Sequence, residues 1–406
     1  MNNSFEAPLS SVVNQYGEQK DKGTLALVTA HTTPSALEEV RQDNNGVTAL
    51  YINFGQDGSH TATQRVRTLV NAQSVPLEEI QLQTIAASFI DTEATRPYDT
   101  GTLINTLHGI AADYALYNGF QTVKILEGFE TASVFHQLPQ YYLALNRQIA
   151  TVAGEGKIDI QGLASHDRDV PPIAKQFTES DNLVLSMLSG GPDSSVLLSE
   201  LIRRYYRKSA VEAIFINFGQ PYMAQELLSA RNIANLCRVR LNEISVAGIS
   251  HAFVGKGEAG VGYPILRNLI NGMYGLASDY ARFRNARELH HANIKEDVIN
   301  LPWMTEFFAA IDQTVGVSAQ QALNVRSEYL TVPKAEVIMR GSEMIGDKLG
   351  GTFSCLTTSA VGKHCGKCRS CRNRRKAFLA SQTEDTTVYE VEPDVGQVEI
   401  YEPPLT

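Results

Sequence analysis

Short apolar runs alternate with stretches of helical periodicity in the C-terminal half of this chain. Residues 183–188 and 211–217 are apolar runs of strand length, and residues 194–202 and 224–237 carry apolar side chains at helical spacing. Apolar strands that are each followed by a helix are typical of a parallel sheet covered on both faces. The pattern predicts an α/β fold whose ligands bind beyond the carboxyl ends of the strands.

The pattern occurs twice along the chain. Residues 51–56, 103–115 and 24–27 return as residues 215–220, 269–281 and 182–185, at offsets of 164, 166 and 158. Three matches in the same order predict a duplicated domain rather than a short solenoid repeat. We expect two tandem copies of a doubly wound, Rossmann-like domain with parallel sheets, at residues 1–153 and 181–380. A linker at 154–180 and an acidic C-terminal tail at 381–406 complete this division.

Composition and charge narrow the class of protein. The 406 residues are 43 % hydrophobic and 19 % charged, as in a globular chain of two or three domains. The net charge of −9 is unevenly spread, with seven acidic residues between Glu384 and Glu402 and seven basic ones between Lys363 and Lys376. This distribution argues against general nucleic-acid binding, and solvated surface is the simplest explanation for both stretches. No apolar run approaches the roughly 20 residues of a membrane helix. Because the N-terminal sequence also resembles no secretory signal, we expect a cytoplasmic protein.

Four of the five cysteines are clustered, at Cys355, Cys365, Cys368 and Cys371. Dense cysteines in a chain without a secretory signal predict metal ligands rather than disulfides. Four thiolates suit a tetrahedral, structural Zn²⁺ ion with no open position. An iron–sulfur cluster is the alternative, although the Cys-Pro that often ends such a run is absent. Cys237 stands apart and is expected to be a core residue.

A glycine-rich turn follows the first apolar run of the second copy, with the sequence Ser189-Gly190-Gly191-Pro192-Asp193-Ser194-Ser195. Glycines let backbone N–H groups approach an anion, a helix N-terminus favours negative charge, and the serine hydroxyls donate hydrogen bonds. No Gly-Lys-Ser/Thr follows, so this is not a Walker A loop. The turn predicts a phosphate site, with an ordinary capped turn as the alternative. The first copy has residues 31–35, His-Thr-Thr-Pro-Ser, at this place, so we expect the second copy alone to contain this phosphate site.

The turn resembles the pyrophosphate loop of the N-type ATP pyrophosphatase (PP-loop) superfamily. Together with residues 217–220, 264–268 and 333–337 and the cysteine cluster, it makes residues 181–380 similar to the 7-cyano-7-deazaguanine synthase family. The resemblance implies ATP and Mg²⁺ as cofactors beside Zn²⁺. It also implies a ligase that adenylates a 7-deazaguanine carboxylate, releases pyrophosphate and passes the acyl group to an amine. In the family this amine is ammonia, and a second adenylation gives the nitrile.

The resemblance further assigns roles to individual residues. Pyrophosphate contacts fall to Ser189, Gly190, Gly191, Ser194 and Ser195, magnesium binding or loop orientation to Asp193, the adenine to Asn217 and Phe218, and phosphate or carboxylate contacts to Arg267 and Lys334. His290 and His291 are further acid–base candidates and Trp303 is a candidate for stacking on a base, with ordinary packing or surface roles as the alternatives.

The sequence also departs from the family. Residues 219–225 lack its His and Glu, and residues 298–306 replace a segment that contributes to substrate recognition. These changes favour an alternative in which the same acyl-adenylate conjugates the deazaguanine to a partner protein, as implied by relatives in antiviral defence. A second alternative is a zinc-stabilised nucleotide-binding interaction protein without catalysis. Because the family forms homodimers, the two copies are expected to pack as a pseudo-dimer, with further homodimerisation as an open alternative.

Overall fold

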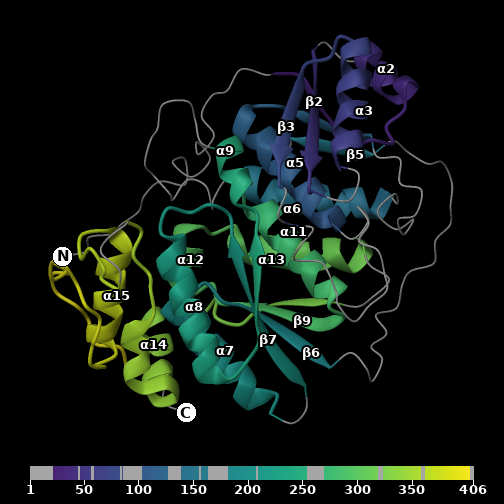
Figure 1. Cartoon of the computed structure of the whole chain (residues 1–406). Coiled ribbons are helices and arrows are strands. Elements are labelled where there is room, and N and C mark those ends of the chain that lie inside the picture. Colours follow the sequence, from purple (N-terminus) through teal and green to yellow (C-terminus); the bar gives the residue numbers. More distant parts are fainter. Residues whose placement is uncertain are drawn as a thin grey trace.

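Two five-stranded parallel sheets with flanking helices form the core of the protein (Figure 1). The computed structural model describes residues 22–43, 46–55, 59–82, 85, 103–126, 139–154, 157–162, 182–206, 209–253, 269–318, 323–357 and 362–402. Both sheets are wholly parallel, which confirms the predicted α/β fold with two tandem, doubly wound units. None of the helices in this described part has the length and apolar character that a bilayer crossing requires.

The first sheet has the strand order β3-β2-β1-β4-β5. Its strands are β1 (Thr24–Val28), β2 (Val47–Asn53), β3 (Leu77–Gln81), β4 (Thr122–Leu126) and β5 (Asp159–Gly162). Its helices are α2 (Pro34–Asp43), α3 (Ser59–Ala72), α5 (Ile104–Asn118) and α6 (Pro139–Ala153). The central strand β1 is buried along its whole length, as expected of an apolar run that is covered on both faces.

Strand β5 lies inside the stretch that was expected to be a linker. It pairs in parallel with β4, with Thr122 opposite Asp159, so the first unit extends to Gly162 rather than ending at residue 153. Ile160 is its one buried residue, and a four-residue edge strand of this kind has no hydrophobic pattern that the sequence could reveal.

The second sheet repeats this topology with the order β8-β7-β6-β9-β10. Its strands are β6 (Leu183–Met187), β7 (Ala210–Asn217), β8 (Leu241–Ser245), β9 (Ala286–His291) and β10 (Asn324–Ser327). Its helices are α7 (Pro192–Arg204), α8 (Met223–Cys237), η4 (Ala247–Ile249), α9 (Ser250–Phe253), α11 (Ile270–Phe283), α12 (Lys295–Asn300) and α13 (Met304–Ser318). Each strand of one sheet therefore has an equivalent in the other.

Equivalent helices join the two halves. Helix α5 packs on α11 and α6 packs on α13, and these four helices lie between the two sheets (Figure 1). The helices approach closely at two equivalent glycines. A Cβ atom at Gly109 would lie 2.5 Å from the Asn271 carbonyl oxygen, and one at Gly275 would lie 2.4 Å from that of Asn105. One hydrophobic core runs through the junction, including Leu107 and Tyr280.

The chain ends in a helical region beside α7, formed by α14 (Lys334–Ile345), η5 (Gly346–Gly351) and α15 (Arg369–Ala380) (Figure 1). The acidic segment that follows packs on this region, although it was expected to be solvated. The side chain of Asp385 is buried and forms an ion pair with Arg375. Arg374 is also buried, and its Nε donates to Thr387 Oγ1 at 2.8 Å. The basic and acidic stretches therefore neutralise each other in part inside the fold.

Candidate functional site

The glycine-rich turn lies at the carboxyl end of β6, directly before α7. Gly190 has a φ of +80°, and a Cβ there would lie 2.3 Å from the Glu226 carbonyl oxygen, so this position requires glycine. The carbonyl oxygen of Gly190 accepts hydrogen bonds from Phe353 N at 2.8 Å and from Ser229 Oγ at 2.7 Å. These contacts fix the turn from two sides.

The serines of this turn support the start of the helix. Ser195 Oγ donates to the Gly191 carbonyl oxygen at 2.7 Å, and Ser194 Oγ donates to the same oxygen at 3.2 Å. Ser189 Oγ lies 3.1 Å from Ser194 Oγ and faces the solvent-accessible side. The backbone and Ser189 are thus presented to a ligand at the positive end of the α7 dipole.

Asp193 and Lys334 form an ion pair beside the turn. Lys334 Nζ lies 2.6 Å from Asp193 Oδ2, while Asp193 Oδ1 is buried and has no hydrogen-bond partner among the described residues. Lys334 begins α14, and its backbone N–H donates to both carboxylate oxygens of Glu296 at 3.0 Å. The lysine is therefore held at a helix start that is 141 residues away from the turn in sequence.

These groups line one cavity of about 820 Å³, which we call the loop cavity. This volume is within the range of about 300–1,000 Å³ that holds small ligands. Its walls come from the turn, from α8, α12 and α14, from α15 and from the C-terminal segment. Residues that sequence reasoning did not assign include Tyr222, Glu226, Glu296, Asp297, Phe353, Ser354, Arg369, Asn373, Lys376 and Glu399.

Glu226 corrects one reading of the sequence. The stretch 219–225 lacks a glutamate at the expected place, yet Glu226, one residue later, lines the cavity and accepts a 2.9 Å hydrogen bond from Gln220 Nε2. Burial raises the pKa of Glu226 to about 8, against the opposing effect of the Gln220 hydrogen bond. A one-residue shift within a helix cannot be seen from motif spacing alone.

The four clustered cysteines converge as predicted. Their sulfur atoms all lie within 4.8 Å of one another, with 3.4 Å between Cys368 and Cys371 and 3.9 Å between Cys365 and Cys371. A tetrahedral ion with bonds of about 2.3 Å to sulfur needs sulfur–sulfur distances of about 3.8 Å. Backbone N–H groups donate to three of the sulfurs, which favours thiolates. The cluster therefore fits one metal ion, and Cys368 also caps α15.

Comparisons with known proteins agree with this geometry. Residues 183–382 match the model of the family described as Queuosine biosynthesis protein QueC. The curated 7-cyano-7-deazaguanine synthase of Thiobacillus denitrificans is 28 % identical over 221 residues, covering 50 % of this chain and 96 % of that protein. The enzyme of that name from Methanocaldococcus jannaschii is 27 % identical over 233 residues, covering 50 % and 98 %.

Residues 183–382 are therefore similar to QueC proteins, and we call this part of the chain the QueC-like domain. Among solved structures, the U34-tRNA thiolase NcsA from Methanococcus maripaludis covers 60 % of this chain and 72 % of its own, at 12 % identity and a TM-score of 0.34. That likeness is too low to inform function. The first half of the chain lies outside the family match.

The QueC-like domain does not bring every predicted residue to its cavity. Asn217 Oδ1 accepts a 3.0 Å hydrogen bond from Gly219 N, and Asn53 Oδ1 accepts one of 2.9 Å from Gly55 N in the first half. The repeated motif therefore builds the same turn in both halves, and neither Asn217 nor the buried Phe218 lines the cavity. Arg267 lies outside the described residues.

The two histidines lie deeper in the QueC-like domain, away from the glycine-rich turn. His290 is buried between Glu288 and Glu328, at 2.8 and 3.0 Å. Burial lowers the pKa of His291 to about 3, so its ring is neutral at physiological pH. Neither ring lines the loop cavity. Trp303 packs edge-on against Phe307 at the core and does not line the loop cavity either.

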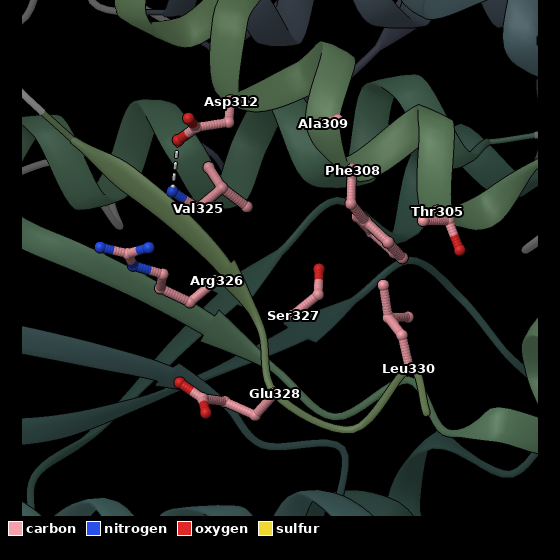
Figure 2. A pocket seen from close by; sticks show the side chains of 9 residues that line it. All are labelled: Thr305, Phe308, Ala309, Asp312, Val325, Arg326, Ser327, Glu328 and Leu330. Carbon is pink, nitrogen blue, oxygen red and sulfur yellow. Dashed lines mark hydrogen bonds between the residues drawn. The ribbon is translucent and has the colours of Figure 1, made fainter. Parts of the chain in front are cut away.

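A second cavity, of about 400 Å³, lies between α13 and the edge strand β10. Figure 2 shows Phe308, Ser327 and Leu330 facing this space, with the Asp312 carboxylate bonded to Val325 N at 2.8 Å. Ser327 Oγ is bonded to His291 Nε2 at 2.6 Å, and the His291 ring lies against Phe308. These contacts account for His291 as a satisfied core residue beneath the cavity floor.

The first half presents a different turn at the equivalent place. Thr32 Oγ1 donates to the Leu126 carbonyl oxygen at 2.6 Å and accepts from Thr29 N at 2.8 Å. The side chain of Thr32 is thus buried inside the turn, and its hydroxyl is hydrogen-bonded to backbone groups. The turn is closed by these bonds, in contrast to the glycine-rich turn of the QueC-like domain.

Proposed function

We propose that the protein is an ATP-dependent carbon–nitrogen ligase. It adenylates a 7-deazaguanine carboxylate, releases pyrophosphate, and transfers the acyl group to ammonia, with release of AMP. The observation that carries this proposal is the shared cavity: the pyrophosphate loop and the Asp193–Lys334 pair face the same space. The family match supports the choice of substrate, since the curated relatives are named 7-cyano-7-deazaguanine synthase.

In the first step, a carboxylate oxygen of the acid attacks the α-phosphorus of ATP, and the bond to the β-phosphate oxygen breaks. Backbone N–H groups of Gly190 and Gly191 and the hydroxyl of Ser189 receive the pyrophosphate at the N-terminus of α7. Lys334 compensates phosphate charge, and its bond to Asp193 fixes its position. Glu226 is largely protonated at neutral pH, so it does not repel the polyphosphate.

Mg²⁺ fits the same corner of the cavity. Asp193 Oδ1 has no partner among the described residues, and the carboxylate of Asp297 also lines the cavity. Hard oxygen ligands of this kind suit magnesium, which keeps several waters and binds phosphate oxygens. When bound, the ion would neutralise charge on the leaving pyrophosphate.

In the second step, the amine attacks the acyl carbon and AMP leaves with the bonding electron pair. A proton passes from the amine to solvent or to the departing phosphate. We assign Zn²⁺ to Cys355, Cys365, Cys368 and Cys371 as a structural ion, because its four ligands come from the protein. Its contribution is positional: α15 begins at Cys368 and supplies one wall of the cavity.

We infer that the first half serves as a fixed, non-catalytic counterpart of the QueC-like domain, so that one chain forms a pseudo-dimer. The packing of equivalent helices, α5 on α11 and α6 on α13, supports this inference. The closed turn around Thr32 supports the absence of a second nucleotide site in the pair.

Incubation of the purified chain with ATP, 7-carboxy-7-deazaguanine and ammonia tests the function. We expect AMP and pyrophosphate to form in amounts that depend on the acid, and mass spectrometry to detect the amide or the nitrile. Binding of ATP without acid-dependent release of pyrophosphate would favour a nucleotide-binding protein without catalysis, and would contradict the proposal.

A further inference from the structure

The C-terminal segment is an addition to the QueC-like domain. The family match ends at residue 382, whereas the structure describes the chain as far as residue 402. Instead of leaving the domain, this segment runs back along α15 and reaches the loop cavity, where Gln397, Val398 and Glu399 form part of the wall.

The first half of the segment is firmly held on the metal-binding region. His364 N donates to the Val388 carbonyl oxygen at 2.9 Å, and Glu390 N donates to that of His364 at 2.8 Å. Arg375 forms ion pairs with Asp385 at 3.4 Å and with Glu392 at 2.8 Å. These bonds fix residues 385–392 on the region that contains the clustered cysteines, and the rest of the segment continues from there.

The far end is anchored separately. Tyr401 N donates to the Ala380 carbonyl oxygen at 2.8 Å, and the Tyr401 hydroxyl bonds to the carboxylate of Glu336 on α14. Between the two anchors the chain turns at Gly396, whose φ is +60° and whose N–H donates to Asp394 Oδ1 at 3.3 Å. The intervening residues thus bridge α15 and α14, two of the helices that border the cavity.

The bridging residues form part of the cavity wall. Gln397, Val398 and Glu399 make no hydrogen bond or ion pair with the residues that the structure describes. Glu399 adds a carboxylate to a wall that also holds the basic residues Arg369 and Lys376 of α15. A carboxylate at the rim repels anions and attracts ammonium groups.

We propose that residues 395–401 form a strap across the mouth of the loop cavity and that this strap selects a small amine as the acyl acceptor. The inference rests on the proposed function. The strap acts on the acceptor in two ways. Tyr401 ties it through its backbone N–H to Ala380 and through its hydroxyl to Glu336, so that the strap restricts the width of the entrance, and Glu399 provides a negative charge for a cationic amine. Ammonia passes this entrance, whereas a polypeptide terminus is too large.

Competition between amines of different size tests the strap. Two variants open it: a chain that ends after Asp394, and the combined substitution Gln397→Gly, Val398→Gly and Glu399→Gly, which retains both anchors. The matched control is Glu402→Gln, which alters an exposed carboxylate one residue beyond the Tyr401 anchor. Each protein receives ATP, the deazaguanine acid, and equal amounts of ammonia and benzylamine, and the amide and nitrile products are quantified by mass spectrometry.

We expect both opened variants to raise the benzylamine-to-ammonia product ratio at least tenfold, while acid-dependent AMP formation stays within about threefold of the unaltered protein. The control should leave the ratio unchanged. An unchanged ratio in the glycine variant overturns the strap, as does equal use of the two amines by the unaltered protein. Absence of acid-dependent AMP in the unaltered protein is a separate result, which refutes the proposed function and the strap with it.

Discussion

Asp113 of α5 and Asp279 of α11 occupy equivalent positions, and each accepts hydrogen bonds from the start of the other helix. Asp279 accepts from Asn105 Nδ2 at 2.7 Å and from Thr106 N at 2.8 Å, while Asp113 accepts from Asn271 Nδ2 and Gly272 N, both at 2.8 Å. Such reciprocity is the signature of an isologous interface, here formed within one chain.

Asp279→Ala should destabilise the whole protein. The change leaves Thr106 N buried without its acceptor and removes one of the two acceptors of Asn105 Nδ2, which costs about 2–4 kcal/mol of unfolding free energy. Denaturant unfolding measures this loss. Glu39→Ala, on an exposed surface of α2, is the control and should change the free energy of unfolding by less than about 0.5 kcal/mol. Equal effects of the two substitutions would show that the reciprocal bonds carry no stability.

Gly190→Ala and Gly191→Ala should differ sharply although they are neighbours. At Gly190 a Cβ would meet the Glu226 carbonyl oxygen at 2.3 Å in a backbone of positive φ, whereas at Gly191 the nearest atom is 3.4 Å away. We expect Gly190→Ala to lower the unfolding free energy by about 2 kcal/mol or more and to abolish ATP binding. Gly191→Ala should fold with a change below about 1 kcal/mol. Calorimetry of unfolding and of ATP binding compares the two, and a well-folded, ATP-binding Gly190→Ala would contradict the assigned geometry.

Lys334→Met should reduce acid-dependent pyrophosphate release by about 100-fold or more, because a cation that compensates phosphate charge is lost. Lys295→Met, an exposed lysine at the start of α12 that does not line the cavity, is the matched control. His31→Ala in the first half should also be neutral, since that half lacks the open turn. A quantitative pyrophosphate assay measures all three proteins. Retention of full activity by Lys334→Met would remove the lysine from the proposed mechanism.

The purified chain should contain about one zinc ion, bound by the four clustered cysteines. Cys368→Ser should lower the metal content and the melting temperature, because binding energy at a structural site is folding energy. Cys237→Ser, at the one cysteine outside the cluster, should retain the metal. Elemental analysis distinguishes the outcomes, and iron in place of zinc would contradict the assignment.

Glu226→Gln should change how stability depends on pH. The folded-state pKa of about 8 lies above the usual 4.5, so between these values the unfolded chain releases a proton that the folded chain retains. The free energy of unfolding therefore falls as pH rises through this window, and the fall ends above pH 8. The glutamine variant lacks this effect, so its advantage in melting temperature should grow from pH 5 to pH 8. If the difference in melting temperature between the two proteins stays constant from pH 5 to pH 8, the Glu226 carboxyl titrates normally and the prediction is wrong.

The sequence predicted the repeated framework well, because long apolar strands and a repeat of about 165 residues leave clear patterns. It placed Asn105 and Asp279 in the repeated segments 103–115 and 269–281 but could not show that they meet, since hydrogen bonds between halves have no local signature. The sequence analysis also missed the edge strand at Ile160 and the position of Glu226, because each of these features depends on a single side chain. The buried Arg374 was read as surface charge, because its partner Thr387 lies in the acidic stretch.

The union of the halves through α5 and α11 has a consequence for the protein at low abundance. Two separate subunits joined by such an interface come apart on dilution, and the fraction assembled falls with concentration. Here both partners are encoded in one chain, so each molecule contains its own counterpart at every concentration. A cell with few copies of this protein would still have every copy assembled.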